Sequence, residues 1–233
     1  MKLLIASDIH GDADCCQAMI AATEREGAEK ILILGDILYH GPRNDLPEGY
    51  APKKVIEMLN AISDKLLCVR GNCDTEVDQM VLSFPVLSDT AFVYDGEEKL
   101  TLFMSHGHKY SPDALPPISG RVVFLYGHTH LQGLCQKDGI PCLNPGSVSL
   151  PKGGNKKTYA VYENASICIK DLDGNEHDSI EEYIKESKFP YMGAEVKASL
   201  NVKDGAIYPN GVMFMSEGKP YNPFAEFDND EED

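Results

Sequence analysis

The first third of the chain alternates short apolar runs with stretches that repeat apolar residues at helical spacing. Residues 2–7, 30–34 and 66–69 are apolar runs of the length of a buried strand, and polar residues beside glycine follow each one. Between these runs, residues 14–26 and 52–62 place apolar side chains on one helical face. The order strand, helix, strand, helix, strand predicts a parallel sheet with helices on its faces.

The second half of the chain is richer in strand patterns. Residues 92–94 and 100–105 flank an Asp-Gly turn, and residues 121–126 are a run of β-branched and aromatic side chains. Hairpin-like pairs surround residues 138–139 and 164–165. We therefore predict an α/β protein in which two mixed β-sheets pack as a sandwich flanked by helices.

The pattern of apolar and polar residues changes at about Ser187. From there aromatic residues, proline and glycine are interspersed without a clear period, and the chain ends in the acidic run DNDEED. The predicted organisation is a main domain over residues 1–186 and a C-terminal extension over residues 187–233. The pattern indicates no role for the extension, which could pack on another subunit or over the main domain's site.

Chemistry-bearing residues recur where the apolar strands end. Five times the next residues are Asp, His or Asn beside glycine, and this is the set: Asp8 and His10, Asp36, Asn72, His106, and His128 with His130. In an open α/β sheet the carboxyl ends of the strands share one edge, where ligands bind. We therefore expect these side chains to converge in the folded protein.

The residue types then indicate a metal site. Imidazole nitrogens mixed with carboxylate and amide oxygens, without thiolates, suit divalent Mn, Fe, Zn, Co or Ni. Seven ligands exceed the needs of one tetrahedral ion, but two ions could share them through a bridging carboxylate. Each motif also has a structural interpretation, such as a helix cap, an Asx turn or a buried histidine, and only the whole series favours metal binding.

Composition narrows the possible partners and the compartment. The formal net charge of −16 argues against a nucleic-acid or anionic-membrane binder, because both need a basic surface. Seven cysteines without a C-x-x-C pair indicate neither a thiolate zinc site nor a disulfide framework. The first apolar run is too short for a signal peptide, so a cytoplasmic location is expected.

The motifs resemble those of the calcineurin-like metallophosphoesterases. The matching series is D-x-H-G, G-D, G-N-C-D, H-G-H and G-H-T-H, and connecting segments such as NPGSVSLPKGGN are similar to the bacterial YfcE-type phosphodiesterases. The resemblance covers residues 1–172 and implies the calcineurin-like metallophosphoesterase fold. It implies this ligand set: Asp8, His10 and His130 for the first metal, Asn72, His106 and His128 for the second, and Asp36 as the bridge.

The resemblance also implies an activity. It predicts a di-metal-dependent phosphodiesterase that hydrolyses small phosphodiesters with a hydroxide bridging two divalent ions, with manganese favoured over zinc, iron, nickel or cobalt. Asn72 would also orient a phosphate oxygen. Cys73 stands where many relatives carry a histidine that protonates the leaving group, which tilts the prediction toward diesters. His40 and Arg43 are candidate substrate contacts, with an ordinary surface loop as the alternative.

A different class of function stays open. A scaffold could use this fold to bind a partner protein, as does the retromer subunit that resembles the family, but such a protein can dispense with histidine ligands. A nuclease on the same fold is disfavoured by the acidic charge and the lack of a basic or aromatic platform. The expected partner is a small phosphodiester, with a homo-oligomer left open and neither nucleic acid nor membrane expected.

Overall fold

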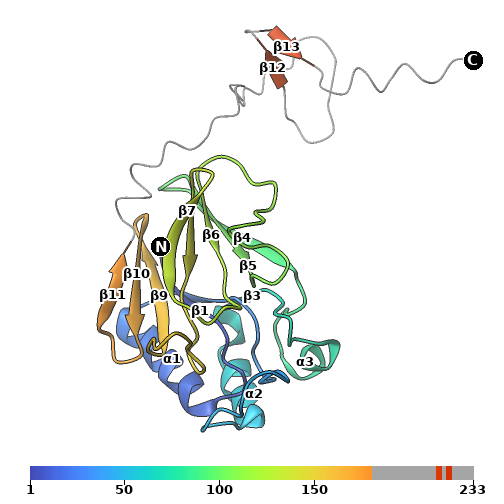
Figure 1. Cartoon of the computed structure of the whole chain (residues 1–233), viewed down its shortest axis with the longest axis vertical. Coiled ribbons are helices and arrows are strands. Elements are labelled where there is room, and N and C mark those ends of the chain that lie inside the picture. The colour runs from blue at the N-terminus through green and yellow to red at the C-terminus, as the bar shows by residue number, and fades with distance from the viewer. Residues whose placement is uncertain (180–213, 217–218, 222–233) are drawn as a thin grey trace, which may run out of the picture. The chain divides into compact units, whose positions relative to one another are not determined.

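The computed structural model describes residues 1–179, 214–216 and 219–221 (Figure 1). The described elements, in chain order, are β1 (Lys2–Ala6), α1 (Ala13–Glu26), β2 (Lys30–Ile33), α2 (Pro52–Asn60), the short 3-10 helix η1 (Ser63–Lys65), β3 (Leu66–Cys68), α3 (Glu76–Val81), β4 (Thr90–Asp95), β5 (Leu100–Ser105), β6 (Val122–Leu125), β7 (Gly133–Lys137), β8 (Ile140–Asn144), β9 (Thr158–Glu163), β10 (Ser166–Asp171), β11 (Glu176–Ser179), β12 (Phe214–Ser216) and β13 (Lys219–Tyr221).

Two mixed sheets form the main body. The first has six strands in the order β11-β10-β9-β1-β2-β3, with β1, β2 and β3 parallel and the remaining pairs antiparallel. The second has five strands in the order β4-β5-β6-β8-β7, with β5, β6 and β8 parallel and an antiparallel strand at each edge. Both sheets therefore contain parallel strands whose carboxyl ends can present loops to a shared site.

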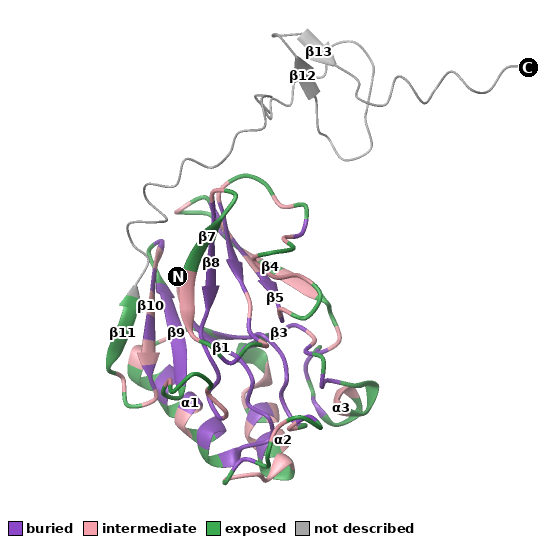
Figure 2. Ribbon diagram, viewed as in Figure 1, coloured by how far each residue is buried: buried purple, intermediate pink, exposed green. Residues whose placement is uncertain are grey.

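The two sheets enclose one apolar layer. Leu3, Ile5 and Leu32 of the first sheet join Leu102 and Val123 of the second in a single buried cluster. Figure 2 shows the strands that flank this layer as largely buried and the outer parts of the helices and turns as exposed. Burial of apolar surface stabilises a fold by about 25 cal/mol per Å², so this layer stabilises the packing of the two sheets against each other.

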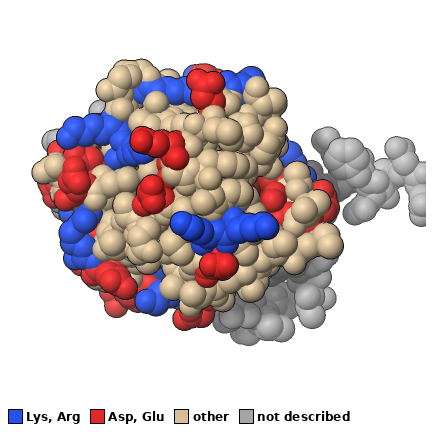
Figure 3. Space-filling model, turned by 90° about the horizontal axis from the view of Figure 1, so that it is seen from below, with Lys and Arg blue, Asp and Glu red and all other residues tan. Residues whose placement is uncertain are grey.

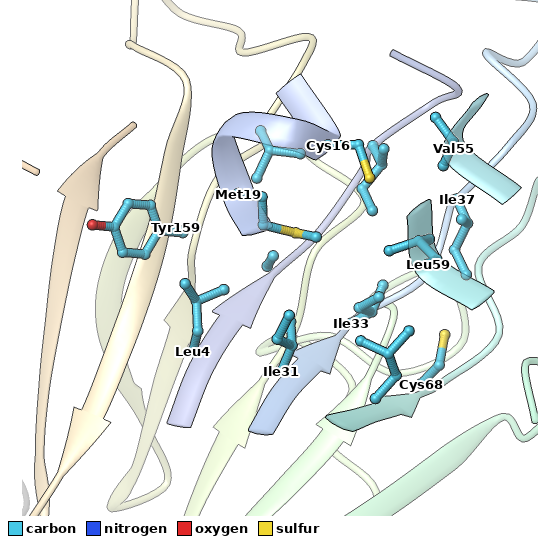
Figure 4. Packing of buried hydrophobic residues seen from close by; sticks show 14 of the residues in the cluster. Leu4, Cys16, Met19, Ile31, Ile33, Ile37, Val55, Leu59, Cys68 and Tyr159 are labelled. Carbon is cyan, nitrogen blue, oxygen red and sulfur yellow. The ribbon is translucent and has the colours of Figure 1, made fainter. Parts of the chain in front are cut away.

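Helices α1 and α2 cover the outer face of the six-stranded sheet. Met19 of α1 and Leu59 of α2 point toward Leu4, Ile31 and Ile33 on the strands (Figure 4). Helix α1 begins where the Asp12 side chain accepts a hydrogen bond from the Cys15 N–H, and it ends at Gly27 in the left-handed conformation. These packed helices fix the positions of the loops that follow β1 and β2.

The structure confirms the predicted sandwich of two mixed sheets with helices outside. Helix α3 was not anticipated, although Thr75 and Asp78 form a capping box at its start. It buries none of its residues, so no apolar periodicity marks it in the sequence.

The chain divides into two compact units, Met1–Phe189 and Pro190–Asp233. In the second unit the described residues form the antiparallel pair β12 and β13. The predicted boundary at residues 186–187 and most of the predicted extension lie outside the described residues and stay predictions. Among the described helices, none is long and apolar enough to cross a membrane.

Candidate metal centre

The predicted ligands lie on the loops that follow parallel strands, and most of these loops bend through an unusual backbone conformation. Five of the seven have a positive φ: Asp8 (58°), His10 (50°), Asp36 (56°), His128 (67°) and His130 (59°). Residues other than glycine rarely adopt this conformation, because it costs roughly 1–3 kcal/mol unless the surroundings impose it. The fold therefore stores strain where the chemistry-bearing side chains are, and each is held there by specific contacts.

Three of these side chains form what we call the closed half of the site: Asp8, His10 and His130. All are buried, and the Nε2 atoms of His10 and His130 lie 3.2 Å apart. Asp8 Oδ1 lies 3.2 Å from His130 Nε2 and 3.5 Å from His10 Nε2, yet it accepts no well-aligned hydrogen bond. Three potential ligand atoms therefore crowd around one point.

The tautomers explain why these nitrogens cannot satisfy one another. His10 Nδ1 donates to the Tyr39 carbonyl oxygen at 2.7 Å, and His130 Nδ1 donates to the Leu150 carbonyl oxygen at 2.6 Å. A carbonyl oxygen only accepts, so these contacts place the proton of each neutral ring on Nδ1 and leave a lone pair on Nε2. Backbone anchoring of the distal nitrogen is the usual support of a metal-binding histidine.

A second group, the open half, consists of Asn72, His106 and His128. His106 is buried and donates through Nδ1 to the Leu34 carbonyl oxygen at 2.7 Å, which turns its Nε2 toward Asn72 Oδ1 at 3.0 Å. The His128 ring lies beside His106, with 5.1 Å between the ring centroids. Asn72 is exposed and His128 only half-buried, so this half faces the solvent.

Asp36 lies between the two halves. Its Oδ2 is 3.7 Å from His10 Nε2 and 3.4 Å from His106 Nε2, while its Oδ1 accepts a hydrogen bond from the Cys73 N–H at 2.8 Å. The predicted bridging residue is thus within reach of one histidine from each half. This arrangement places one carboxylate between the two groups of predicted ligands.

The electrostatics of the site favour positive charge. Burial lowers the pKa of His106, but contact with Asp36 and the charges of Asp8 and Asp36 outweigh burial and raise that pKa to about 9. Burial alone would raise the pKa of the Asp8 carboxyl, yet His10 and His130 hold it well below its usual value. Protons and metal cations respond to the same electrostatic field. The carboxylates of Asp8 and Asp36 therefore stay ionised and attract a cation.

Asp74 positions the loop of Asp36, and it was not among the predicted site residues. Its buried carboxylate accepts three backbone N–H bonds, from Asp36 at 2.8 Å, Ile37 at 2.9 Å and Gly71 at 2.7 Å. Burial raises the pKa of Asp74 to about 6, against the effect of these donors. The contacts clamp the β2 and β3 loops together, and the strained φ of Asp36 depends on them.

Hydroxyl groups of the segment after β8 hold the loop of Asp8. Ser147 and Ser149 both donate to the Asp8 carbonyl oxygen, at 2.8 and 2.9 Å. Asn144 donates to the Gly127 carbonyl oxygen at 2.9 Å and so fixes the loop that carries His128. The Asn-Pro-Gly-Ser motif therefore acts as a brace that ties the loop after β1 to the loop after β6.

A polar pocket opens beside the open half. These residues line it: Asp36, Gly41, Pro42, Arg43, Asn44, Asn72, Cys73, His128, His130 and Lys152. Arg43 therefore lies where substrate would approach, and Lys152 adds a second cation that the sequence motifs did not single out.

On the face that Figure 3 displays, described Lys and Arg side chains alternate with Asp and Glu and form no continuous basic band.

Two other candidates lie differently from Arg43. His40 is half-buried and packs edge-on between Tyr39 and Tyr50, with ring centroids 4.7 and 5.5 Å away, and it is not among the pocket's lining residues. The Cys73 thiol does line the pocket and accepts from Asn72 Nδ2 at 3.2 Å. Burial raises the pKa of Cys73 well above its usual value, so this thiol stays protonated.

The donor set fits divalent metal ions. Groups of ligand atoms within 4.8 Å of one another are formed by Asp8, His10 and His130, and by Asp8, Asp36 and His106. Nitrogen lone pairs directed at carboxylate oxygens repel one another unless a cation lies between them, which is the arrangement of a nitrogen–oxygen metal site.

The fold and this donor set define a class of protein, and comparison with known proteins agrees. The sequence model of the calcineurin-like phosphoesterase superfamily domain matches residues 1–166, so the chain belongs to this family. The curated Phosphodiesterase YfcE of Escherichia coli (strain K12) is 49% identical over 169 residues, which span 72% of this chain and 91% of that protein.

A solved structure and a second relative support this assignment. The solved structure of YfcE, described as a phosphoesterase from E. coli, superposes with a TM-score of 0.75 at 45% identity and covers 78% of this chain and 99% of that one. The probable metallophosphoesterase YsnB of Bacillus subtilis (strain 168) is 25% identical over 190 residues, 78% of this chain and 97% of that protein. The chain is therefore a metal-dependent phosphoesterase, and this family uses divalent metal ions.

Proposed function

We propose that this chain is a two-metal phosphodiesterase that hydrolyses small phosphodiesters. The observation that carries the proposal is the pair of ligand groups joined by Asp36. His10 Nε2 in the closed half and His106 Nε2 in the open half lie 3.7 and 3.4 Å from the same Asp36 oxygen. One carboxylate shared by two sets of imidazoles is the arrangement that a pair of ions requires.

The residues of this chain divide the work between the two halves. The closed half and the open half each hold one ion, and the backbone carbonyl contacts of the histidines keep the ligand nitrogens oriented. When bound, the metal pair supplies Lewis acidity and activates a water molecule at neutral pH. Asn72 directs Oδ1 toward His106 and keeps its Nδ2 on the pocket side, beside Cys73, where it can donate to a phosphate oxygen.

Arg43 and Lys152 bind the anionic substrate in this proposal. Both line the pocket, and neither forms an ion pair within the described residues. In a chain with a net charge of −16, two unpaired cations beside the metal ligands concentrate positive potential at this opening. The Arg43 guanidinium can pair with two phosphate oxygens and the Lys152 ammonium with one.

Diesters suit the site better than monoesters. A basic leaving alcohol needs a proton donor, and the residue beside Asn72 is the thiol of Cys73, a weak general acid near neutral pH. A diester with an acidic leaving group, such as an aryl alcohol, depends least on that donor. The E. coli relative is named a phosphodiesterase, which supports the same choice. Among the ions that fit a nitrogen–oxygen ligand set we propose manganese, ahead of zinc, iron, nickel and cobalt.

Hydrolysis of bis(p-nitrophenyl) phosphate and of p-nitrophenyl phosphate tests the proposal. The full chain is stripped of metal, and Mn, Zn, Ni, Co or Mg is added back separately. We expect the diester to be cleaved faster than the monoester, with the highest rate in manganese. Binding of about two ions per chain, measured by titration calorimetry, checks the stoichiometry independently of activity.

Substrate contacts are tested by neutralising one cation at a time. Arg43→Gln and Lys152→Gln should each raise KM for the diester about tenfold with little change in kcat, since a charge-assisted contact contributes about 1.4 kcal/mol. Lys53→Gln, on the exposed side of α2, is the matched control and should change nothing. Folded protein that is inactive with every metal would overturn the enzyme proposal and favour the scaffold function.

A further inference from the structure

Two cysteines lie directly opposite each other at the edge of the five-stranded sheet. Cys135 of β7 pairs with Cys142 of β8 in the antiparallel register, and Asp138 and Gly139 connect the two strands. Both turn residues have a positive φ, 50° and 78°, as a two-residue turn requires. Residues opposite each other in such a pair project to the same face of the sheet.

The spacing from the turn sets the distance between the two cysteines. The register places Lys137 opposite Ile140 beside the turn, Gln136 opposite Pro141, and Cys135 opposite Cys142 after that. Hydrogen-bonded pairs alternate with other pairs along an antiparallel ladder, and a pair that contains proline cannot exchange both bonds, so the two cysteines are expected to form a hydrogen-bonded pair. The Cα atoms of such a pair are about 5.5 Å apart. Disulfides span Cα separations of about 4.4–6.8 Å, so the backbone need not move to allow one.

The two thiols already touch and differ sharply in exposure. Cys135 contacts the Cys142 thiol and, after burial, is the next cause that raises the pKa of Cys142 to about 12. Cys142 is fully buried against Val122, Phe124 and Ile140, whereas Cys135 is exposed on the edge strand. An oxidant therefore reaches Cys135 first, while the Cys142 thiol is buried beside it.

The other cysteines lack this arrangement. Cys15 and Cys16 are neighbours on α1, where consecutive side chains point in different directions, and both are buried. Cys135 is the exposed one among the seven free cysteines of the chain. A partner on the facing strand and access to solvent thus coincide at a single position.

We propose that Cys135 and Cys142 are a reversible oxidation site that forms an intramolecular disulfide with hydrogen peroxide. The Cys135 thiolate attacks one peroxide oxygen, the O–O bond breaks, and the departing hydroxide takes up a proton to become water. The resulting sulfenic acid is attacked at sulfur by Cys142, the S–O bond breaks, and a second water leaves. Two thiols lose two electrons, and the peroxide is reduced to two molecules of water.

The hairpin of β7 and β8 adjoins the loops that carry His128 and His130, so a disulfide in it would constrain the region next to the predicted metal ligands. Strand β7 begins shortly after His130, and Asn144 at the end of β8 holds the Gly127 carbonyl of the loop that carries His128. A disulfide whose cysteine lies at an exposed sheet edge is accessible to thiol reductants, so it can be reduced again. The bond would protect Cys135 from irreversible oxidation and fasten the hairpin behind the metal ligands.

Thiol counting and peptide mass spectrometry test the proposal on the full chain. Reduced protein is treated with a small excess of hydrogen peroxide, alkylated with N-ethylmaleimide in denaturant and digested. We expect two fewer free thiols than the seven of the reduced chain and a peptide linked between Cys135 and Cys142 that dithiothreitol releases. Cys135→Ser changes an exposed side chain and should abolish the link, whereas Cys168→Ser should leave it unchanged.

Three results would overturn the proposal. The first is Cys135 oxidised to the sulfinic acid while Cys142 remains a free thiol. The second is a link between Cys135 residues of two chains, visible as a dimer on a non-reducing gel. The third is a link that dithiothreitol does not release, since the proposed site is reversible.

Discussion

The carboxyl edge of the strands and the hairpin turns use the same backbone conformation for different reasons. Among the described residues, nine other than glycine have a positive φ. Five are predicted metal ligands at the carboxyl edge, and the other four form or flank hairpin turns: Lys99, Asp138, Asn164 and Ala165. The turns need a left-handed residue to match the twist of the strands, so any residue that tolerates it will serve.

At the carboxyl edge the side chain, and not the turn, explains the conformation. Asp8, His10, Asp36 and His130 are buried and held by hydrogen bonds or close polar contacts, while Lys99 and Asp138 are exposed. Strain that is held in place by many contacts and concentrated on one set of side chains indicates function. Strain at an exposed turn residue can be removed without loss.

The largest effect is expected at Asp8. Asp8→Asn keeps the size of the side chain and removes its charge, so metal-dependent hydrolysis should fall about 10³-fold, since several kcal/mol of charge stabilisation depend on the ligand set. Steady-state kinetics and metal analysis of the purified variant measure both effects. Asp95→Asn is the control, because Asp95 is a buried carboxylate bonded to the Tyr162 hydroxyl away from the predicted ligands. Full activity of Asp8→Asn would remove Asp8 from the ligand set.

His128 tests whether the two halves differ. His128→Ala should lower hydrolysis about 10²-fold while one ion stays tightly bound in the closed half, whose ligands are buried and anchored to the backbone. His130→Ala should instead release the ion of the closed half. Calorimetric titration of manganese into each stripped variant distinguishes the two. Equal loss of both ions in both variants would contradict the division into a closed and an open half.

The sequence predicted the edge because its signals are local. Asp8, Asp36 and His128 each follow an apolar run with a glycine within three residues, and parallel topology brings such strand ends together. The sandwich was predictable for the same reason, since β-branched runs and Asp-Gly turns mark its strands. The resemblance in the motifs added the metal assignment to each residue, which no spacing alone provides.

Other features depend on contacts that leave no local pattern. Lys152 lines the pocket because its segment returns beside His130, whose carbonyl oxygen accepts from the Lys152 N–H at 3.0 Å. His40 packs between two tyrosines instead of lining the pocket, and nothing in its loop indicates this. Asp74 stands in the recognised motif, but its three backbone partners come from the tertiary approach of two loops.

We expect Asp74 to stabilise the folded protein by holding the loops that follow β2 and β3. Asp74→Ala leaves three buried backbone N–H groups without their acceptor and should lower the free energy of unfolding by about 2–4 kcal/mol. Urea unfolding measures this change, and Asp89→Ala is the control. Asp89 pairs with Lys109 at the surface, where a salt bridge contributes about 0–1 kcal/mol. A loss of under 1 kcal/mol in Asp74→Ala would mean that the Asp36 loop holds its conformation unaided.

The smallest effect is expected at the hairpin turn between β4 and β5, where the substitution should raise the free energy of unfolding instead of lowering it. Lys99 is exposed with a φ of 50°, so Lys99→Gly removes a left-handed cost of about 1–2 kcal/mol and adds roughly 0.5–1 kcal/mol of unfolded-state entropy. The net stabilisation should be about 0.5 kcal/mol, a rise in Tm of roughly 1–2 °C for a chain of this size, with hydrolysis unchanged. Differential scanning calorimetry detects it. If Lys99→Gly were destabilising, the turn would depend on its side chain as the carboxyl edge does, and the contrast between the two regions would disappear.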